Sequence, residues 1–400
     1  MKLEDMLAQL AKGPAYHAAR LGLMDPPGPV TLTFSVTAAC QSRCKTCRIG
    51  EMFGEHPERA EADLSLAEIE RTFQTLGHVY FFNVSGGEPF LRRDLPEIVE
   101  LACRYLAPGI VHIPTNGIAT SRILAGTERI LDVMGRLCPH VPLTIKPSID
   151  GVGQHHDEVR GFPGNWKRLL ATIEGLKEIE SRHDTFHLEL GTVISRFNLD
   201  HLDEIADFVR SVGVQSYRSE IAEQRAEFFN KEDPITPDAE TYERLIRQFA
   251  ARIRRDTPLK RGLAKLTEAF RLVYYDLVVR ILKERRQVIP CFGGISNVHI
   301  NYDGQVWPCC VLGYDKPLGH LRDVDFDFQT VWHSPQARQV RRYIAQGGCA
   351  CPLANQAYSN ILYHPPSLAR VAANYAEFVG RRAARDAAGR LERILRGKKR

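Results

Sequence analysis

The sequence predicts an α/β protein whose main domain is a parallel sheet or an incomplete β/α barrel. β-rich and helix-periodic segments alternate six times between residue 31 and about residue 220, which is typical of β/α units. Polar segments follow the strands, at the edge where parallel β/α folds bind ligands. From residue 290 the pattern changes to short strands with clustered cysteines, which indicates a second, smaller module.

The six expected strands are short, and amphipathic helices separate them. The first of these helices begins at Ser65, which forms a capping box with Glu68. A helical, charged stretch follows the sixth strand, and Asp303-Gly304 marks a hairpin turn in the cysteine-containing module. We expect strands at 31–37, 79–85, 110–115, 142–149, 186–195 and 214–220, and helices at 65–77, 94–106, 121–137, about 166–179 and 200–213.

These patterns divide the chain of 400 residues into five parts. The predicted parts are an N-terminal helical segment at 1–28, the β/α core at 29–225, a helical linker at 226–288, a small cysteine-containing domain at 289–355 and a basic helical tail at 356–400.

The composition is that of a globular protein outside the membrane. Hydrophobic residues make up 44% and charged residues 25% of the chain, which is ordinary. The N-terminus has no apolar signal-peptide core, and charged residues interrupt the most apolar stretch, 269–282, too often for a membrane span. We therefore expect a cytoplasmic protein with no membrane partner.

Ten cysteines in a reducing compartment indicate metal binding or chemistry rather than disulfides. Cys40, Cys44 and Cys47 form a C-x3-C-x2-C run directly after the first strand. A structural zinc site completed by His56 or a distant cysteine is one reading, although zinc sites usually contain C-x2-C pairs. Three thiolates also suit three corners of a four-iron cluster, whose fourth iron then stays open to a chelating ligand.

Polar or glycine-rich segments also follow the other five strands. Because parallel strands end at one rim, a single shared site is the simplest account. Capping of the following helices is the structural alternative for Glu88 and Asp150. The segments are Ser85–Pro89, Thr115–Gly117, Ser148–Gly151, Ser195-Arg196 and Glu220.

The cysteine run, together with "GGEP", "TNG" and "SIDG", resembles the radical S-adenosylmethionine (SAM) enzymes over residues 29–225. The resemblance implies a partial (β/α)6, TIM-like barrel. It implies that Cys40, Cys44 and Cys47 ligate a 4Fe-4S cluster whose open iron binds SAM. Reductive cleavage of SAM then yields a 5′-deoxyadenosyl radical that takes a hydrogen atom from the substrate.

The same resemblance assigns SAM contacts to the strand ends, while no catalytic residue is singled out. One departure is Thr46, where the family often has an aromatic residue near the adenine; Phe53 or a residue of the fifth or sixth strand could cover that role. His155, His156 and Asp157 follow "SIDG", but we expect a solvated loop there, not a metal site. The implied SAM contacts are Gly86, Gly87, Glu88, Pro89, Asn116, Ser148 and Asp150.

The C-terminal cysteines resemble the SPASM or shorter twitch domains that hold auxiliary iron–sulfur clusters in this family. Five cysteines suffice for one 4Fe-4S cluster, and Cys309 and Cys310 could exchange roles. Four cysteine ligands would close the cluster, which then suits electron transfer. Three ligands would leave one iron open to substrate. The alternative to an iron–sulfur cluster is a zinc knuckle. The expected ligands are Cys291, Cys309, Cys349 and Cys351, with Cys310 spare.

The resemblance implies an enzyme that takes an electron from a reductant such as ferredoxin or flavodoxin. Only about 28 residues precede the first strand, so no separate peptide-recognition domain is evident. We therefore expect a small metabolite as substrate, namely a sugar, an aminocyclitol or a cofactor precursor. The alternative is a maturase of ribosomal peptides or proteins. A zinc-stabilised nucleic-acid-binding module is a remote alternative, because the basic segments lack interleaved aromatic residues.

Overall fold

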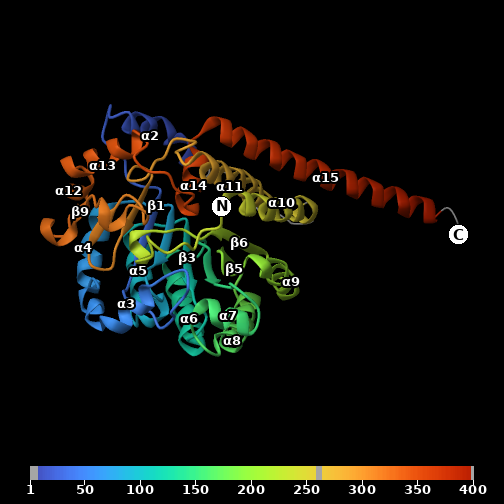
Figure 1. The fold of residues 1–400 in the computed structure, drawn as a ribbon, viewed down its shortest axis with the longest axis horizontal. Helices are drawn as coiled ribbons and strands as arrows, with labels where there is room; N and C mark the ends of the chain where they lie inside the picture. Colours follow the sequence, from blue (N-terminus) through green and yellow to red (C-terminus); the bar gives the residue numbers. More distant parts are fainter. Residues whose placement is uncertain (1–7, 258–263, 398–400) are drawn as a thin grey trace.

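The computed structural model describes residues 8–257 and 264–397 and has one nine-stranded sheet at its centre (Figure 1). The strand order is β6-β5-β4-β3-β2-β1-β7-β8-β9, and all pairs from β6 to β7 are parallel. The strands are β1 (Thr31–Ser35), β2 (Phe81–Ser85), β3 (Ile110–Thr115), β4 (Leu143–Pro147), β5 (Phe186–Ile194), β6 (Ser216–Ile221), β7 (Asn297–Ile300), β8 (Gln305–Trp307) and β9 (Gly319–His320).

The first six strands and their helices form the predicted β/α core, in which each strand pairs with the next one in the chain. The Ser65–Glu68 capping box is present at the start of the first crossover helix. The crossover helices are α4 (Leu66–Leu76), α5 (Leu95–Tyr105), α6 (Thr120–Leu137), α8 (Asn165–Arg182) and α9 (Leu202–Val212).

Two short helices of the core were not predicted. Helix α7 (Gln154–Arg160) contains His155 and His156, which we had expected on a loop. A further short helix, α3 (Ile49–Glu55), follows the cysteine run. Helix α7 borders the loop that carries Cys40, Cys44 and Cys47, because Lys45 N donates to the Val159 carbonyl at 2.9 Å.

The cysteine-containing module continues the same sheet. Strand β7 pairs in parallel with β1, and β8 returns antiparallel through the predicted turn at Asp303-Gly304. Two helices follow β9, namely α12 (Phe328–Trp332) and α13 (Pro335–Ala345), and α13 contacts α2 (Gly13–Arg20). Backbone hydrogen bonds therefore join this module to the β/α core.

The remaining helices pack beside β6 and form the tail. Helix α11 (Ala264–Glu284) contacts α10 (Ala239–Asp256), α14 (Ala354–Leu362) and α15 (Pro365–Gly397). Helix α15 then extends away from the body of the protein (Figure 1). Among the described residues, no helix combines the length and the apolarity that crossing a lipid bilayer would require.

A buried charged group lies within the sheet. His112 on β3 donates a 2.7 Å hydrogen bond from Nδ1 to Asn83 Oδ1, and its Nε2 lies 3.7 Å from Glu189 on β5. Arg218 Nε on β6 is 3.2 Å from the same carboxylate. Burial raises the pKa of Glu189, but Arg218 and His112 outweigh it and hold that pKa well below its usual value. Burial lowers the pKa of His112 to about 4.

Candidate radical-generating site and auxiliary cysteine site

The loop between β1 and α3 carries Cys40, Cys44 and Cys47 and rests on the turn that follows β2. Gly87 N donates to the Thr37 carbonyl at 2.9 Å, and Glu88 N donates to the Ala39 carbonyl at 2.8 Å. These two bonds fix the backbone that leads into Cys40. The cysteine run and the "GGEP" turn are therefore one structural unit.

Glycines line this loop because its backbone lies too close for any side chain. A Cβ on Gly87 would lie 2.1 Å from the Ala39 carbonyl oxygen, and one on Gly50 would lie 1.8 Å from the Ser42 carbonyl oxygen. Gly161, at the end of α7, has a φ of +60°, and a Cβ there would lie 1.9 Å from the Arg43 carbonyl oxygen. The loop is thus held from three sides by backbone contact.

The three cysteines are half-buried, and their thiols influence one another. Burial, together with a smaller contribution from the neighbouring Cys44, raises the pKa of Cys40 to about 12. Burial, followed by Cys44 and Cys40, also holds the pKa of Cys47 well above its usual value. Thiolates in such a place need a bound cation, so the donor set fits a metal group.

The spacing of the sulfur atoms favours a cluster over a single zinc ion. Sulfur atoms around one tetrahedral zinc lie about 3.8 Å apart. Within the described residues, neither predicted cysteine set brings three ligand atoms within 4.8 Å of one another; that arrangement occurs instead at Glu227, His299 and Cys310.

Glu88 joins the "GGEP" turn to the "TNG" segment. Its buried carboxylate accepts hydrogen bonds from Phe90 N at 3.2 Å, Thr115 Oγ1 at 2.9 Å and Asn116 N at 2.7 Å. Burial raises the pKa of Glu88, while these three donors lower it. The helix-capping alternative is thus present, since Glu88 caps the short 3-10 turn Pro89–Leu91.

The "SIDG" segment holds a buried ion pair beside the cysteines. Asp150 Oδ2 lies 2.9 Å from Arg160 NH1, and its Oδ1 accepts from Val193 N at 2.8 Å. Burial lowers the pKa of Arg160, but Cys44 and Asp150 outweigh it and raise that pKa above its usual value. The Arg160 guanidinium is therefore a fixed positive charge near Cys44 and Cys40, a feature that sequence reasoning missed.

Two further predicted residues lie on the same rim. Ser148 N donates to the Thr115 carbonyl at 3.0 Å, which places "SIDG" beside "TNG". Asn116 Oδ1 accepts from Ile118 N at 3.0 Å, whereas its Nδ2 is buried and has no protein partner. That orphaned donor suits the polar groups of a ligand such as SAM.

The residues after "SIDG" do not converge on a metal. His155 stacks on His201 with ring centroids 3.7 Å apart, while His156 Nδ1 accepts from Asp150 N at 3.3 Å. Asp157 accepts from Trp166 N at 2.6 Å and so anchors the start of α8.

The auxiliary cysteines form a second group, in which Cys291 is buried and the others are half-buried. Burial, with smaller contributions from the nearby Cys291 and Cys349, raises the pKa of Cys309 to about 12. Burial, followed by Glu223, Cys309 and Cys291, holds the pKa of Cys351 well above its usual value. Cys310 points elsewhere, because Arg225 NH1 donates to its Sγ at 2.8 Å.

This geometry agrees with comparisons with known proteins. The radical SAM superfamily model matches residues 34–209, and the iron–sulfur cluster-binding SPASM domain model matches residues 291–352. The chain belongs to the radical SAM superfamily and carries a C-terminal SPASM domain. It is an enzyme of the class that uses 4Fe-4S clusters and SAM.

Individual relatives are distant. The chain is 25% identical over 323 residues to the AdoMet-dependent heme synthase of Oleidesulfovibrio alaskensis, covering 78% of this chain and 76% of that protein. It is 25% identical over 332 residues to the mycofactocin maturase MftC of Mycolicibacterium smegmatis, covering 80% and 75%. Streptococcus suis SuiB bound to its precursor peptide SuiA has a similar fold, with a TM-score of 0.54 at 13% identity over 85% of this chain and 70% of SuiB.

Proposed function

We propose that this enzyme uses SAM-derived radical chemistry to modify a peptide, with Cys40, Cys44 and Cys47 holding the SAM-binding cluster. The observation that carries the radical chemistry is the glycine-lined loop, which presents three thiols next to the "GGEP" turn. Bound there, the cluster and SAM supply a radical that removes a hydrogen atom from the substrate. A one-electron donor such as ferredoxin or flavodoxin serves as reductant.

The residues around the loop hold other groups in position and do not themselves react. Glu88 holds the two glycines and Asn116 in one arrangement, so that backbone groups and the free Asn116 Nδ2 face the SAM site. Asp150 fixes the Arg160 guanidinium, whose positive charge lies near the thiol of Cys44. Gly86, Pro89 and Ser148 complete the proposed SAM surroundings.

Cys291, Cys309, Cys349 and Cys351 are proposed to hold the auxiliary cluster. Four thiolates leave no open iron, so the group suits electron transfer rather than substrate binding. The separate surroundings of Cys310 support its exclusion from this set.

The substrate proposal departs from the small metabolite expected from the sequence. Relatives named for peptide processing support it: the maturase MftC, a PqqA peptide cyclase that is 27% identical over 199 residues, and the bacteriocin biosynthesis protein AlbA. The second candidate is a cofactor precursor, because AdoMet-dependent heme synthases match at similar identity and coverage.

The test of the radical chemistry is anaerobic production of 5′-deoxyadenosine. Reconstituted wild-type protein, with about eight irons if both clusters form, should release this product from SAM when dithionite is added. Cys44→Ala should abolish the product and remove about four irons. Wild-type protein with full iron that never yields 5′-deoxyadenosine would show that the proposal is wrong.

The substrate is tested by adding short precursor peptides encoded near the gene, or a haem precursor, to the same reaction. A peptide that accelerates 5′-deoxyadenosine formation and changes mass supports the peptide proposal. Acceleration and conversion of the haem precursor alone would support the second candidate instead.

A further inference from the structure

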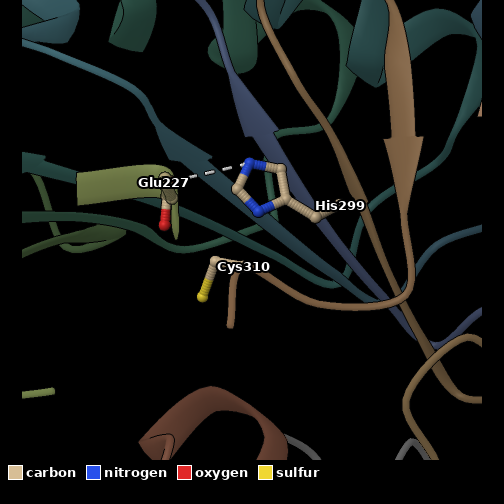
Figure 2. Close-up of side chains that lie close together, drawn as sticks. All are labelled: Glu227, His299 and Cys310. Carbon is tan, nitrogen blue, oxygen red and sulfur yellow. Dashed lines mark ion pairs between the residues drawn. The ribbon is translucent and has the colours of Figure 1, made fainter. Parts of the chain in front are cut away.

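Three potential metal ligands from distant parts of the chain meet outside both predicted cluster sites. Glu227 lies in the 3-10 turn Ala226–Phe228 after β6, His299 lies on β7, and Cys310 follows β8. All three are buried, and one ligand atom from each lies within 4.8 Å of the others (Figure 2). This group is named the Glu–His–Cys site below.

His299 is held with one ring nitrogen free. Its Nε2 lies 2.7 Å from Ser35 Oγ and 3.9 Å from Glu227 Oε1. A nitrogen that faces a hydroxyl and a carboxylate carries the proton, so Nδ1 keeps its lone pair. The His299 side chain is only 2% exposed, and its Nδ1 is buried without a protein partner. In Figure 2 this second nitrogen lies on the side of the ring that faces Cys310.

This hydrogen-bonding pattern is the one that metal-binding histidines have. Such a histidine donates its other N–H to a fixed outer partner, which sets the tautomer and the ring orientation. Ser35, at the end of β1, is that partner here. A structural histidine in the core would be expected to satisfy both nitrogens.

The site also has more acidic groups than cations. Arg225 NH1 lies 2.8 Å from Cys310 Sγ and 3.4 Å from Glu227 Oε2, and its NH2 lies 3.7 Å from Glu223 Oε2. One guanidinium thus faces three groups that can each carry a negative charge. A guanidinium has no free lone pair and cannot be a metal ligand. Its N–H groups can, however, stabilise a thiolate that binds a metal. A divalent cation would balance the remaining charge.

There is room for one more small ligand next to the carboxylate. A cavity of about 20 Å³ is lined by Glu227, Ser35, Gly86 and Gly87, among others. This volume is enough for one water molecule. Glu227 is the member of the Glu–His–Cys site that lines this cavity, and Gly86 and Gly87 of the "GGEP" turn line it as well.

We propose that Glu227, His299 Nδ1 and Cys310 bind one divalent cation of the zinc class, with a fourth position open to this cavity. Sulfur, imidazole nitrogen and carboxylate oxygen are the ligands that zinc prefers, and three protein ligands with one open position are typical of a catalytic zinc. Binding releases the Cys310 thiol proton to solvent as the metal–sulfur bond forms. The proposal does not depend on whether the substrate is a peptide.

The test titrates zinc into anaerobically reconstituted, full-length holoenzyme whose iron content is known, in competition with a chromophoric chelator. We expect one tight zinc per chain in addition to about eight irons. Glu227→Gln, His299→Gln and Cys310→Ala should each weaken zinc binding at least 100-fold while iron stays at about eight. Cys138→Ala removes a cysteine distant in sequence from this site and is the matched control, with zinc affinity unchanged.

X-ray absorption at the zinc edge of the wild-type protein gives a second readout that does not require a folded variant. One sulfur and two or three nitrogen or oxygen neighbours are expected. Wild-type protein that binds no stoichiometric zinc, or zinc with several sulfur neighbours, would overturn the proposal. Loss of about four irons in Cys310→Ala would overturn it too, because Cys310 would then belong to the auxiliary cluster.

Discussion

Replacing Gly87 with alanine should dismantle the radical-generating site while leaving the auxiliary site intact. The added Cβ would lie 2.1 Å from the Ala39 carbonyl oxygen and 3.1 Å from Cys40 Cβ. Gly87 has no positive φ, so the effect is one of contact and not of backbone strain. An ordinary carbon–oxygen contact requires the two loops to separate by about 1 Å or more, which costs roughly 1–3 kcal/mol.

That separation also breaks the hydrogen bonds from Gly87 N and Glu88 N that position Cys40. A displacement of about 1 Å near reacting atoms can cost 10²-fold in rate. We expect iron to fall from about eight to about four per chain, and 5′-deoxyadenosine formation to fall at least 100-fold.

The matched control is Gly135→Ala in the last turn of α6, where a Cβ would meet nothing within 4 Å. Alanine in a helix interior is favoured over glycine by about 1 kcal/mol, so this variant should keep its iron and unfold at a slightly higher temperature. Gly87→Ala protein with full iron and a rate within twofold of wild type would refute the close-contact argument.

Two other perturbations test buried groups. In Glu88→Gln, one acceptor oxygen remains for the three donors that now share the two oxygens of Glu88. We expect the free energy of unfolding in urea to fall by about 1–3 kcal/mol and SAM to bind more weakly. Unchanged stability and affinity would contradict the positioning role of Glu88. Burial lowers the pKa of His112 from 6.5 to about 4. Between these two pH values the His112 ring therefore stays neutral in the native protein but binds a proton in the unfolded chain. Its contribution to stability is therefore lost as pH falls from about 6.5 towards 4, on the order of 2 kcal/mol between pH 7 and pH 5. The stability of His112→Asn in urea should depend less on pH than that of wild type, whereas replacing the exposed His187 with Gln should leave the pH dependence unchanged. If stability plotted against pH has the same slope for His112→Asn and wild type, the burial argument is wrong.

Local features of the fold could be predicted from the sequence. The expected strands 31–37 and 214–220 became Thr31–Ser35 and Ser216–Ile221, because apolar runs bounded by loop residues define strands locally. The capping box at Ser65 is equally local. Helix α7 was missed, since its seven residues are mostly polar and lack a clear apolar stripe.

The cysteine positions of the candidate site could also be predicted, but their charged neighbours could not. Arg160 and Arg225 belong to no motif, and only tertiary packing places one beside Cys44 and the other beside Cys310. His299, within the buried strand β7, gives no sign in the sequence that one of its nitrogens lacks a partner.

The pairing of β7 with β1 decides how the two cysteine sites are related. Thr31 pairs with Asn297 and Phe34 with Ile300, across more than 260 residues of chain. No local pattern predicts such a contact, and the sequence therefore suggested a separate module after residue 289. Because β1 leads into the radical-generating loop and β7 leads into the hairpin that carries Cys309, one backbone ladder fixes the distance between the two sites. Ser35 on β1, bonded to His299 on β7, lies at that junction.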